Sequence, residues 1–164
     1  MKAAVFFADG FEDIEALSPV DYMRRAGIEV VTVGVKGVPY NNTMIVTSSH
    51  KVPMIMDITL TDFLAQYGDA LPDCVCCPGG SVGADNLSEN TQLLAYLEKC
   101  NKAGKLVSAI CASPAVVLGK TDILKNKKWS FGGIDSTVLR IIKMRSVYYQ
   151  IPQLYDVRLF SNLE

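Results

Sequence analysis

Cysteine has the strongest nucleophilic chemistry among the residue types of this chain, and Cys111 occupies the most informative position. It follows the apolar segment 106–110 and precedes Ala112-Ser113-Pro114, so we expect a buried strand to turn into a helix at this cysteine. A nucleophile elbow has the same arrangement, with a serine oxygen in place of the sulfur. Backbone N–H groups at the start of the following helix would favour the reactive thiolate. The alternative is a packing role, because cysteine is common in protein cores.

Gly79 and Gly80 offer the complementary chemistry of oxyanion binding. They follow the apolar segment 74–77 and Pro78, so they should lie at the end of a second buried strand. Because glycine has no Cβ, its backbone N–H can closely approach a bound anion or a developing oxyanion. A tight turn is the simpler interpretation of Pro-Gly-Gly taken alone. Beside a nucleophile, however, the two glycines would complete a site.

Three carboxylates, Glu12, Asp13 and Glu15, stand at the start of the first predicted helix. The helix dipole stabilises negative charge there, which is a sufficient explanation for Glu12 and Asp13. Glu15 differs because it flanks the apolar stripe of the helix, from where its side chain can point into a crevice. A carboxyl group held beside a thiolate has a raised pKa, so it can stay protonated and donate a hydrogen bond to sulfur.

Neither the run of three cysteines nor the single histidine predicts a metal site. In a strand, Cys74 and Cys76 point to one face and Cys77 to the other, and no second cluster of Cys or His completes a tetrahedral set. We therefore expect packing cysteines and no metal. His50 lies in a polar, turn-like stretch and is expected in a solvated loop. A Cys-His dyad with Cys111 would need this histidine.

The apolar pattern predicts the elements that position these residues. A continuous apolar run is typical of a strand buried on both faces, and a period of 3.6 residues is typical of a helix. The first helix is expected to bury a stripe of Ile14, Leu17, Val20 and Met23 and to end at Gly27. The predicted strands are 3–7, 28–33, 44–47, 52–58, 74–77 and 106–110, and the predicted helices are 12–26, 60–67, 91–103 and 115–118.

Strands that alternate with helices predict an α/β fold, in which a mostly parallel sheet has helices on both faces. Residues 34–42 are expected to form a turn, and Pro53 indicates an edge strand or an excursion from the main sheet. The carboxyl ends of parallel strands share one edge, where ligands bind in the crevice. We therefore expect the segments of Glu15, Gly79 and Cys111 to meet there.

The composition is that of one ordinary domain, and we expect residues 1–164 to form it. The chain has 49% hydrophobic and 20% charged residues, which argues against disorder and against a coiled coil. A formal net charge of -1 gives no general attraction to nucleic acid or to an anionic membrane. No apolar stretch approaches the ~18 residues of a membrane span. The odd count of five cysteines disfavours a secreted disulfide framework, so we expect a cytoplasmic protein.

Together these segments resemble the ThiJ/PfpI superfamily, in particular its Parkinson disease protein 7-like branch. The matching segments, in the family's order, are 8–16, 19–28, 77–80, 83–87 and 109–115. They extend over the first four-fifths of the chain. The resemblance implies a three-layer, flavodoxin-like fold, related to that of class I glutamine amidotransferases, and a homodimer.

The resemblance also implies roles for the residues singled out above. Cys111 corresponds to the family's nucleophilic and oxidation-prone cysteine, and Glu15 to its hydrogen-bonded acid partner. Gly79, Gly80 and Ala112 correspond to backbone donors that bind an oxyanion. The implied reaction begins with attack of the Cys111 thiolate on an aldehyde carbonyl, while Glu15 shuttles the proton.

Two further residues match positions near the family pocket or the family dimer. Arg25 matches an arginine near the pocket, and His50 stands where relatives carry a basic residue contributed across the dimer interface. The implied activity is that of a cofactor-free glyoxalase or deglycase acting on a small aldehyde or a glycated substrate. The alternative is a redox sensor or chaperone whose Cys111 is oxidised to a sulfinate without turnover. A binding domain without activity is a third, weaker interpretation.

The chain departs from the family pattern at two places. Peptidase members carry a histidine directly after the nucleophile, where this chain has Ala112, so proteolysis is not expected. Relatives often have a pocket histidine about twenty residues beyond the cysteine, where this chain has Trp129-Ser130-Phe131-Gly132. The family's closing segments are not recognisable in residues 130–164, which form an atypical tail.

Overall fold

A five-stranded parallel sheet forms the centre of the computed structural model, which describes residues 1–126 of the chain. The strand order is β6-β2-β1-β7-β8, and every neighbouring pair is parallel. The strands of this sheet are β1 Lys2–Ala8, β2 Glu29–Lys36, β6 Ile58–Thr59, β7 Cys74–Cys77 and β8 Leu106–Ala109. The predicted α/β class with a mostly parallel sheet is confirmed.

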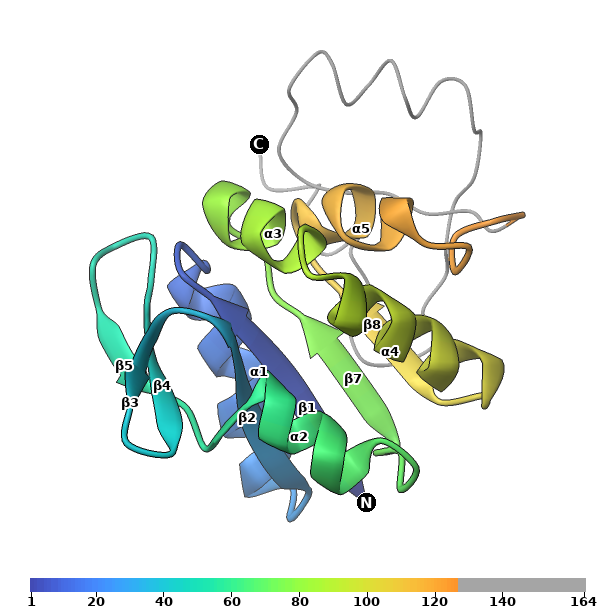
Figure 1. Ribbon diagram of the computed structural model, residues 1–164, viewed down its shortest axis with the longest axis horizontal. Helices are drawn as coiled ribbons and strands as arrows, with labels where there is room; N and C mark the ends of the chain where they lie inside the picture. Colours follow the sequence, from blue (N-terminus) through green and yellow to red (C-terminus); the bar gives the residue numbers. More distant parts are fainter. Residues whose placement is uncertain (127–164) are drawn as a thin grey trace.

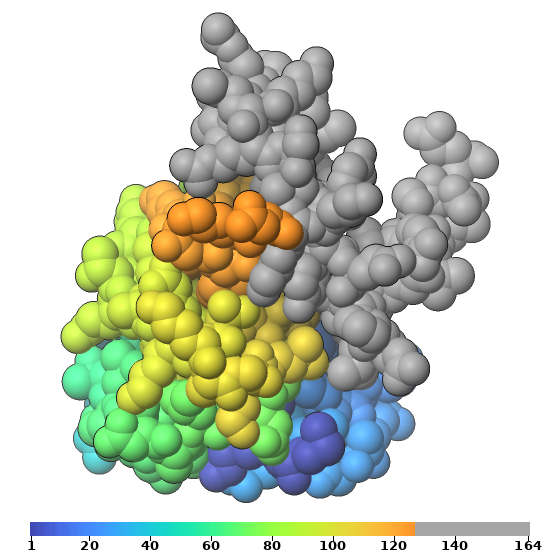
Figure 2. Space-filling view, turned by 90° about the vertical axis from the view of Figure 1, so that its right-hand side faces the viewer, coloured from blue at the N-terminus to red at the C-terminus, as the bar shows by residue number. Residues whose placement is uncertain are grey.

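Helices cover both faces of this sheet and give three layers (Figure 1). In that view α1 lies behind the sheet, and α2 and α4 lie in front of it. Figure 2 shows the yellow segment that contains α4 beside the orange segment that contains α5. The helices are α1 Asp13–Arg25, α2 Leu60–Tyr67, α3 Ser81–Ser88, α4 Thr91–Lys102 and α5 Ser113–Val116, followed by the 3-10 turn η1 Leu118–Lys120. Within residues 1–126 no helix is both long and apolar enough to cross a membrane.

β1 is the central strand, and its continuous apolar sequence reflects burial on both faces. Ala4 and Phe6 belong to the core cluster under α2 and α4, whereas Val5 and Phe7 belong to the cluster under α1. Alternate side chains of a strand point to opposite faces, so each face of β1 serves a different core. This rigid strand carries the loop that leads to Glu15.

The apolar stripe of α1 differs from the prediction at its first member. Ile14 is 70% exposed, whereas Val20 and Met23 are buried and Leu17 is partly buried against the same core. Ala16 takes the place of Ile14 and is fully buried. Two positions along a helix turn the side chain by about 200°, so Ile14 points away from the face that Ala16 presents to the sheet.

A small antiparallel sheet leaves the main sheet after β2, in the order β3-β4-β5. Its strands are β3 Val38–Tyr40, β4 Thr43–Thr47 and β5 Pro53–Ile55. The predicted turn at 34–42 is wrong, because β2 continues to Lys36 and β3 follows it directly. Only Asn41 and Asn42 remain as the hairpin turn, and Asn41 has a positive φ of 50°. The excursion predicted from Pro53 is confirmed, since β5 is an edge strand of this sheet.

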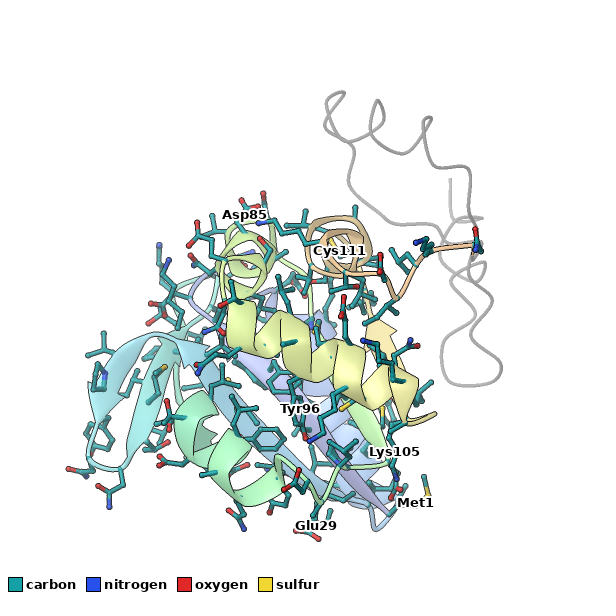
Figure 3. The ribbon with its side chains drawn as sticks, turned by 45° about the vertical axis from the view of Figure 1, so that its right-hand side comes forward. Met1, Glu29, Asp85, Tyr96, Lys105 and Cys111 are labelled. Carbon is teal, nitrogen blue, oxygen red and sulfur yellow. The ribbon has the colours of Figure 1, made fainter. Side chains whose placement is uncertain are left out.

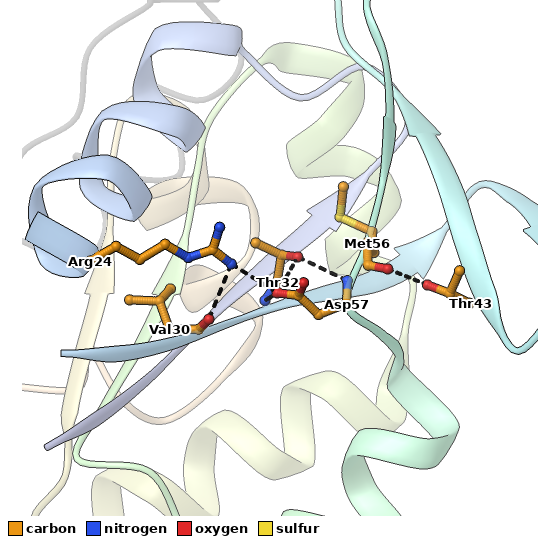
Figure 4. Close-up of polar contacts among 6 residues, drawn as sticks. All are labelled: Arg24, Val30, Thr32, Thr43, Met56 and Asp57. Atoms are coloured by element: carbon orange, nitrogen blue, oxygen red, sulfur yellow. Dashed lines mark hydrogen bonds and ion pairs between the residues drawn. The ribbon is translucent and has the colours of Figure 1, made fainter. Parts of the chain in front are cut away.

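A polar network connects the end of α1, β2 and the segment before β6 (Figure 4). Asp57 accepts hydrogen bonds from the backbone N–H and the hydroxyl of Thr32, both at 2.8 Å. The Arg24 guanidinium donates to the same carboxylate at 3.0 Å and to the Val30 carbonyl at 3.2 Å. The network fixes the register of the main sheet where the small sheet rejoins it.

Two helical segments were not predicted as they stand in the structure. α3 begins directly after Gly80 and was missed, because its sequence of small and polar residues has no strong helical period. The helix expected at 115–118 begins two residues earlier, as α5, and is followed by η1. The atypical tail at 130–164 lies outside the described residues.

Candidate active site

Cys111 lies at the sharp turn between β8 and α5, as a nucleophile elbow requires. Its backbone has a φ of 59°, a left-handed conformation that residues other than glycine seldom adopt. The preceding Ile110 donates its N–H to the Cys77 carbonyl at 3.2 Å, and Ser113 donates its N–H back to Ile110 at 3.1 Å. In Figure 3 Cys111 lies at the opposite end of the sheet from Met1, Glu29 and Lys105, which mark the amino ends of the strands.

The neighbouring strand β7 ends in the glycine turn that faces this elbow. Gly80 has a φ of 87° and is the N-cap residue of α3. The Ser113 hydroxyl donates to the Pro78 carbonyl at 2.5 Å, which joins the elbow to the glycine turn. Sequence reasoning missed this role of Ser113, although its position two residues after a candidate nucleophile and at the start of a helix was a usable clue.

Gly79 separates Glu15 from Cys111 and is the point where the three predicted segments meet. A Cβ built on Gly79 would lie 2.3 Å from Glu15 Oε2, 2.4 Å from Cys111 Cβ and 3.1 Å from Cys111 Sγ. These atoms lie close to one position beside the glycine, and the Glu15 carboxyl group interacts with the Cys111 thiol there. The structure therefore brings Glu15, Gly79 and Cys111 together at the carboxyl edge of the sheet.

Backbone hydrogen bonds hold the segment of Glu15 in this place. Glu12 donates its N–H to the Gly79 carbonyl at 3.1 Å, and its carboxylate accepts the N–H of Glu15 at 2.7 Å as the N-cap of α1. Upstream, the Asp9 carboxylate accepts the Thr47 N–H at 2.7 Å, and the Asn86 amide donates to the Asp9 carbonyl at 2.8 Å. Asp9 and Asn86 were not predicted as site residues, although both lie in segments that carry the family resemblance.

The carboxyl group of Glu15 is held in a partly dry environment. Its Oε2 atom is buried and has no partner of good hydrogen-bond geometry, alone among the buried side-chain oxygens and nitrogens of residues 1–126. Burial raises the pKa of Glu15, and its interactions with the Cys111 thiol and the Gly79 N–H only partly counteract this rise. A raised pKa favours the neutral carboxylic acid, which can donate a proton.

The pKa of the Cys111 thiol is also raised, mainly by burial. The backbone N–H groups of Gly80 and Ala112 lower it, whereas the charge and the hydrogen bond of Glu15 raise it. The sequence predicted that the N–H groups at the elbow would favour the thiolate. They act in that direction, but desolvation of the thiol outweighs them. Proton removal from Cys111 therefore needs a base, and Glu15 is adjacent.

His50 lies at the rim of the site, on the turn between β4 and β5. Its Nδ1 atom is 2.6 Å from the Asp13 carboxylate, which is at the start of α1. The pKa of Asp13 is lowered by hydrogen bonds from Ser48 and then His50, and the hydrogen bond with Asp13 raises the pKa of His50. His50 is exposed, as predicted, and it faces the first turn of α1 rather than Cys111.

Arg25 is not brought to the site within one chain. It pairs with Asp21 one helical turn earlier, at 2.8 Å, and its side chain is 74% exposed. Ten positions of α1 separate it from Glu15, which is about 15 Å along the helix. A role for Arg25 at the site would therefore need a second copy of the chain.

Glu12, Asp13 and His50 present donor atoms that all lie within 4.8 Å of one another, a spacing that can hold a cation. All three are already engaged, since Glu12 caps α1 and Asp13 pairs with His50. These contacts at the start of α1 explain why the three side chains lie close together. We assign no metal to it.

The chain belongs to the DJ-1/PfpI family, whose pattern it matches over residues 1–136. It is 38% identical over 117 residues to the Parkinson disease protein 7 homolog of Danio rerio, an alignment that covers 71% of this chain and 58% of the relative. It is 29% identical over 133 residues to protein/nucleic acid deglycase 2 of Escherichia coli, covering 77% of this chain and 68% of that protein.

The fold agrees with this membership. A DJ-1 superfamily protein of Salmonella typhimurium superposes with a TM-score of 0.75 and 33% identity, over 94% of this chain and 77% of that one. The predicted family resemblance is confirmed. The aligned segment spans little more than half the length of the Danio rerio relative.

Proposed function

We propose that this protein is a cofactor-free cysteine enzyme that acts on small reactive carbonyl compounds, as a glyoxalase or a deglycase. The observation that carries the proposal is the contact of Glu15 and Cys111 on either side of Gly79. A nucleophile beside a carboxyl group of raised pKa is the arrangement that addition of a thiol to an aldehyde needs. The relative named as a deglycase supports the same substrate class.

In the first step the Cys111 sulfur attacks the aldehyde carbon of methylglyoxal, and a C–S bond forms as the C=O π bond breaks. The Glu15 carboxylate accepts the thiol proton and returns it to the new alkoxide, which gives a hemithioacetal. The raised pKa of Glu15 brings the basicity of its carboxylate closer to that of the Cys111 thiolate. Transfer of the proton from the thiol to the carboxylate therefore costs less free energy. Backbone N–H groups of Gly80 and Ala112 would stabilise the oxyanion while it forms.

The second half of the reaction moves one proton and adds one water. Glu15 removes the hydrogen on the carbon that bears sulfur, and the resulting enediol takes up a proton at the neighbouring carbon to give a thioester. Water then hydrolyses the thioester, which releases lactate and restores the Cys111 thiol. No oxidant is consumed, because one carbon is oxidised as its neighbour is reduced. In a hemiaminal of methylglyoxal the C–N bond would break first, as the hydroxyl proton passes to the departing amine, and the aldehyde that forms again would follow the same steps.

We further propose that the protein works as a homodimer in the cytoplasm. In a dimer that brings α1 of each chain close to its partner, the exposed Arg25 and His50 would be available to the second site. The five cysteines are free thiols, which fits a reducing compartment. Ala112 follows the nucleophile in place of a histidine, so we do not propose peptidase activity.

Conversion of methylglyoxal to lactate by the purified full chain tests the proposal. We expect Cys111→Ser to lower kcat/KM by at least about a hundredfold, because a hydroxyl is a much weaker nucleophile than a thiol. Glu15→Gln should cause a loss of about a hundredfold or more, the usual contribution of a positioned acid or base. Cys100→Ala is the control, since this buried thiol lies in the core between α4 and the sheet. Full activity in Cys111→Ser would refute the mechanism.

Redox sensing by Cys111 is the lesser candidate, because burial holds the thiol in its protonated and less oxidisable form. Intact-mass spectrometry under graded hydrogen peroxide separates the two functions. Sensing requires a two-oxygen adduct on Cys111 at peroxide levels that leave the buried Cys77 and Cys100 unmodified. If the protein turns over methylglyoxal but peroxide does not oxidise Cys111 selectively, redox sensing is excluded and the catalytic role remains.

A further inference from the structure

Cys74 and Cys76 lie side by side on one face of β7, and the chemistry proposed above uses neither of them. Their Sγ atoms are 3.6 Å apart. Both side chains pack against the core cluster under α1, and each is partly accessible. Two thiols in contact can together bind one ion, which a single packing cysteine cannot do.

The two thiols are joined by a hydrogen bond between their sulfur atoms, in which either sulfur can be the donor. A cation placed between the sulfurs would take the position of the proton in that bond.

The strand geometry favours a bridging ion over a disulfide. Residues i and i+2 of a strand have Cα atoms about 6.6 Å apart, and the pleat aims their Cβ atoms in parallel. A disulfide needs Cβ atoms within about 3.8 Å of each other, so it would require β7 to bend. Two metal–sulfur bonds of about 2.3 Å in a linear arrangement separate the sulfurs by roughly 4.6 Å. The observed Sγ–Sγ distance is 3.6 Å, so the two side chains would rotate apart by about 1 Å on binding.

The number of ligands decides which ion fits. Potential metal-ligand side chains (Cys, His, Asp and Glu) cluster in threes or more at one place in the part of the chain that the structure describes. That group is Glu12, Asp13 and His50. No third donor of these types therefore joins Cys74 and Cys76 within residues 1–126. Structural zinc needs four ligands, whereas soft thiolates select monovalent copper among the biological ions. The sequence predicted no metal here because a tetrahedral set is incomplete, and a two-coordinate ion does not need that set.

We propose that Cys74 and Cys76 form a two-thiolate site for one monovalent copper ion. On binding, two Cu–S bonds form, two S–H bonds break and both protons leave to solvent, while copper keeps its oxidation state. Ser108, the register partner of Cys76 on β8, is hydrogen-bonded to the Cys76 sulfur and so acts as a positioning residue. The site does not depend on the function proposed for Cys111.

Anaerobic titration of the full chain with Cu(I), against the chromogenic competitor bicinchoninate, tests this site. We expect one tightly held copper ion per chain in the wild type. Cys74→Ala should weaken binding by about a hundredfold or more, since loss of a ligand costs more than loss of an outer-shell contact. Cys111→Ser should bind copper like the wild type, which separates this proposal from the catalytic one. Copper binding that survives Cys74→Ala, or that is lost in Cys111→Ser, would overturn the site.

A second measurement needs no variant and so does not depend on how substitutions in β7 affect folding. X-ray absorption at the copper edge of the loaded wild type should show two sulfur neighbours, at a distance shorter than the about 2.3 Å of four-coordinate zinc, and no nitrogen or oxygen neighbour. A shell of three or four ligands, or one containing nitrogen, would contradict a site built from Cys74 and Cys76 alone. Ser108→Ala should keep the two-sulfur shell and lower the affinity by about tenfold or more.

Discussion

At the scale of single residues, the chemistry of this protein depends on how Glu15 and Cys111 share protons. Both groups have a raised pKa, and burial is the first cause in each case. The glycine between them leaves room for that contact and allows no larger residue. The Glu15 carboxylic acid is therefore neutral over a wider pH range than that of an exposed glutamate. Its ionisation at higher pH lowers the stability of the folded state by an amount that can be measured.

We predict that Glu15→Gln stabilises the protein at neutral pH and has little effect near pH 4. The pKa of Glu15 is raised from 4.5 in the folded state, so the folded protein binds more protons than the unfolded chain above that pH. Its stability then falls as pH rises through this range, while a glutamine does not titrate. Because solvent reaches part of the side chain, the gain at pH 7 should be about 1 kcal/mol, or roughly 2–4 °C in Tm.

Thermal unfolding of both proteins from pH 4 to pH 8 measures this difference. Glu12→Gln is the matched control, because Glu12 is close in sequence but caps α1 by accepting the backbone N–H of Glu15. That variant should lose stability at neutral pH. An equal change in the two variants, or a gain for Glu15→Gln that does not depend on pH, would contradict the assignment of a raised pKa to Glu15.

At the scale of elements, the turn from β7 to α3 positions the site because it contains Gly79. We predict that Gly79→Ala lowers kcat/KM by about a hundredfold, since displacement of reacting groups by about 1 Å has that effect. The added methyl group would come within 2.4 Å of Glu15 Oε2 and Cys111 Cβ, so one of them must move. Steady-state turnover of methylglyoxal measures the loss.

Gly27→Ala provides the control for this substitution. Gly27 has a φ of 75° and no atom within 4 Å of the position of an added Cβ, so its variant is strained but not crowded. It should unfold more easily by about 1 kcal/mol and keep its turnover. Equal activity in Gly79→Ala and Gly27→Ala would show that the glycine at the site is not needed for catalysis.

The network at Asp57 shows how connecting segments hold the elements in register. We predict that Asp57→Ala destabilises the protein by about 1–3 kcal/mol, because it leaves the N–H and hydroxyl of Thr32 without their acceptor. Arg24→Ala should cost about 0.2–1 kcal/mol, since this ion pair is half exposed. Urea unfolding of the two variants measures the difference. A larger loss in Arg24→Ala would mean that the ion pair, rather than the contacts with Thr32, holds the network together.

At the scale of the whole molecule, α1 exposes large apolar side chains within the part of the chain that the structure describes. Ile14 is 70% exposed and Tyr22 is 68% exposed. Contiguous apolar patches mark interaction sites, and these two side chains lie about two turns apart on the same helix. We predict that the full chain forms a homodimer through α1 and that Ile14→Lys shifts it to the monomer, by at least a tenfold rise in the dimer dissociation constant.

Light scattering across a range of protein concentrations measures this shift. Val82→Lys is the control, since Val82 is 60% exposed but lies on α3. That variant should dimerise like the wild type. A wild type that stays monomeric at high concentration, or dimerisation that survives Ile14→Lys but not Val82→Lys, would contradict the proposed interface.

The sequence by itself determined four strands of the main sheet and the position of the candidate nucleophile, but not β6, which was predicted as part of one strand at 52–58. The run 3–7 predicted a buried strand because a strand covered on both faces has no polar side, and β1 confirmed it. Cys111 was predicted at a strand-to-helix turn from its neighbours alone, and its positive φ agrees with that prediction. These inferences succeed because they depend on local patterns and on the shared edge of parallel strands.

Only the tertiary structure decided how the candidate groups stand relative to one another. The exposure of Ile14, the contact of His50 with Asp13 and the distance of Arg25 from Glu15 depend on which surface each element presents to its neighbours. The direction of the Cys111 pKa also depended on burial, a property of the whole assembly of elements rather than of the turn itself. Sequence patterns record the period of an element, whereas desolvation and close approach arise only when elements from distant parts of the chain pack together.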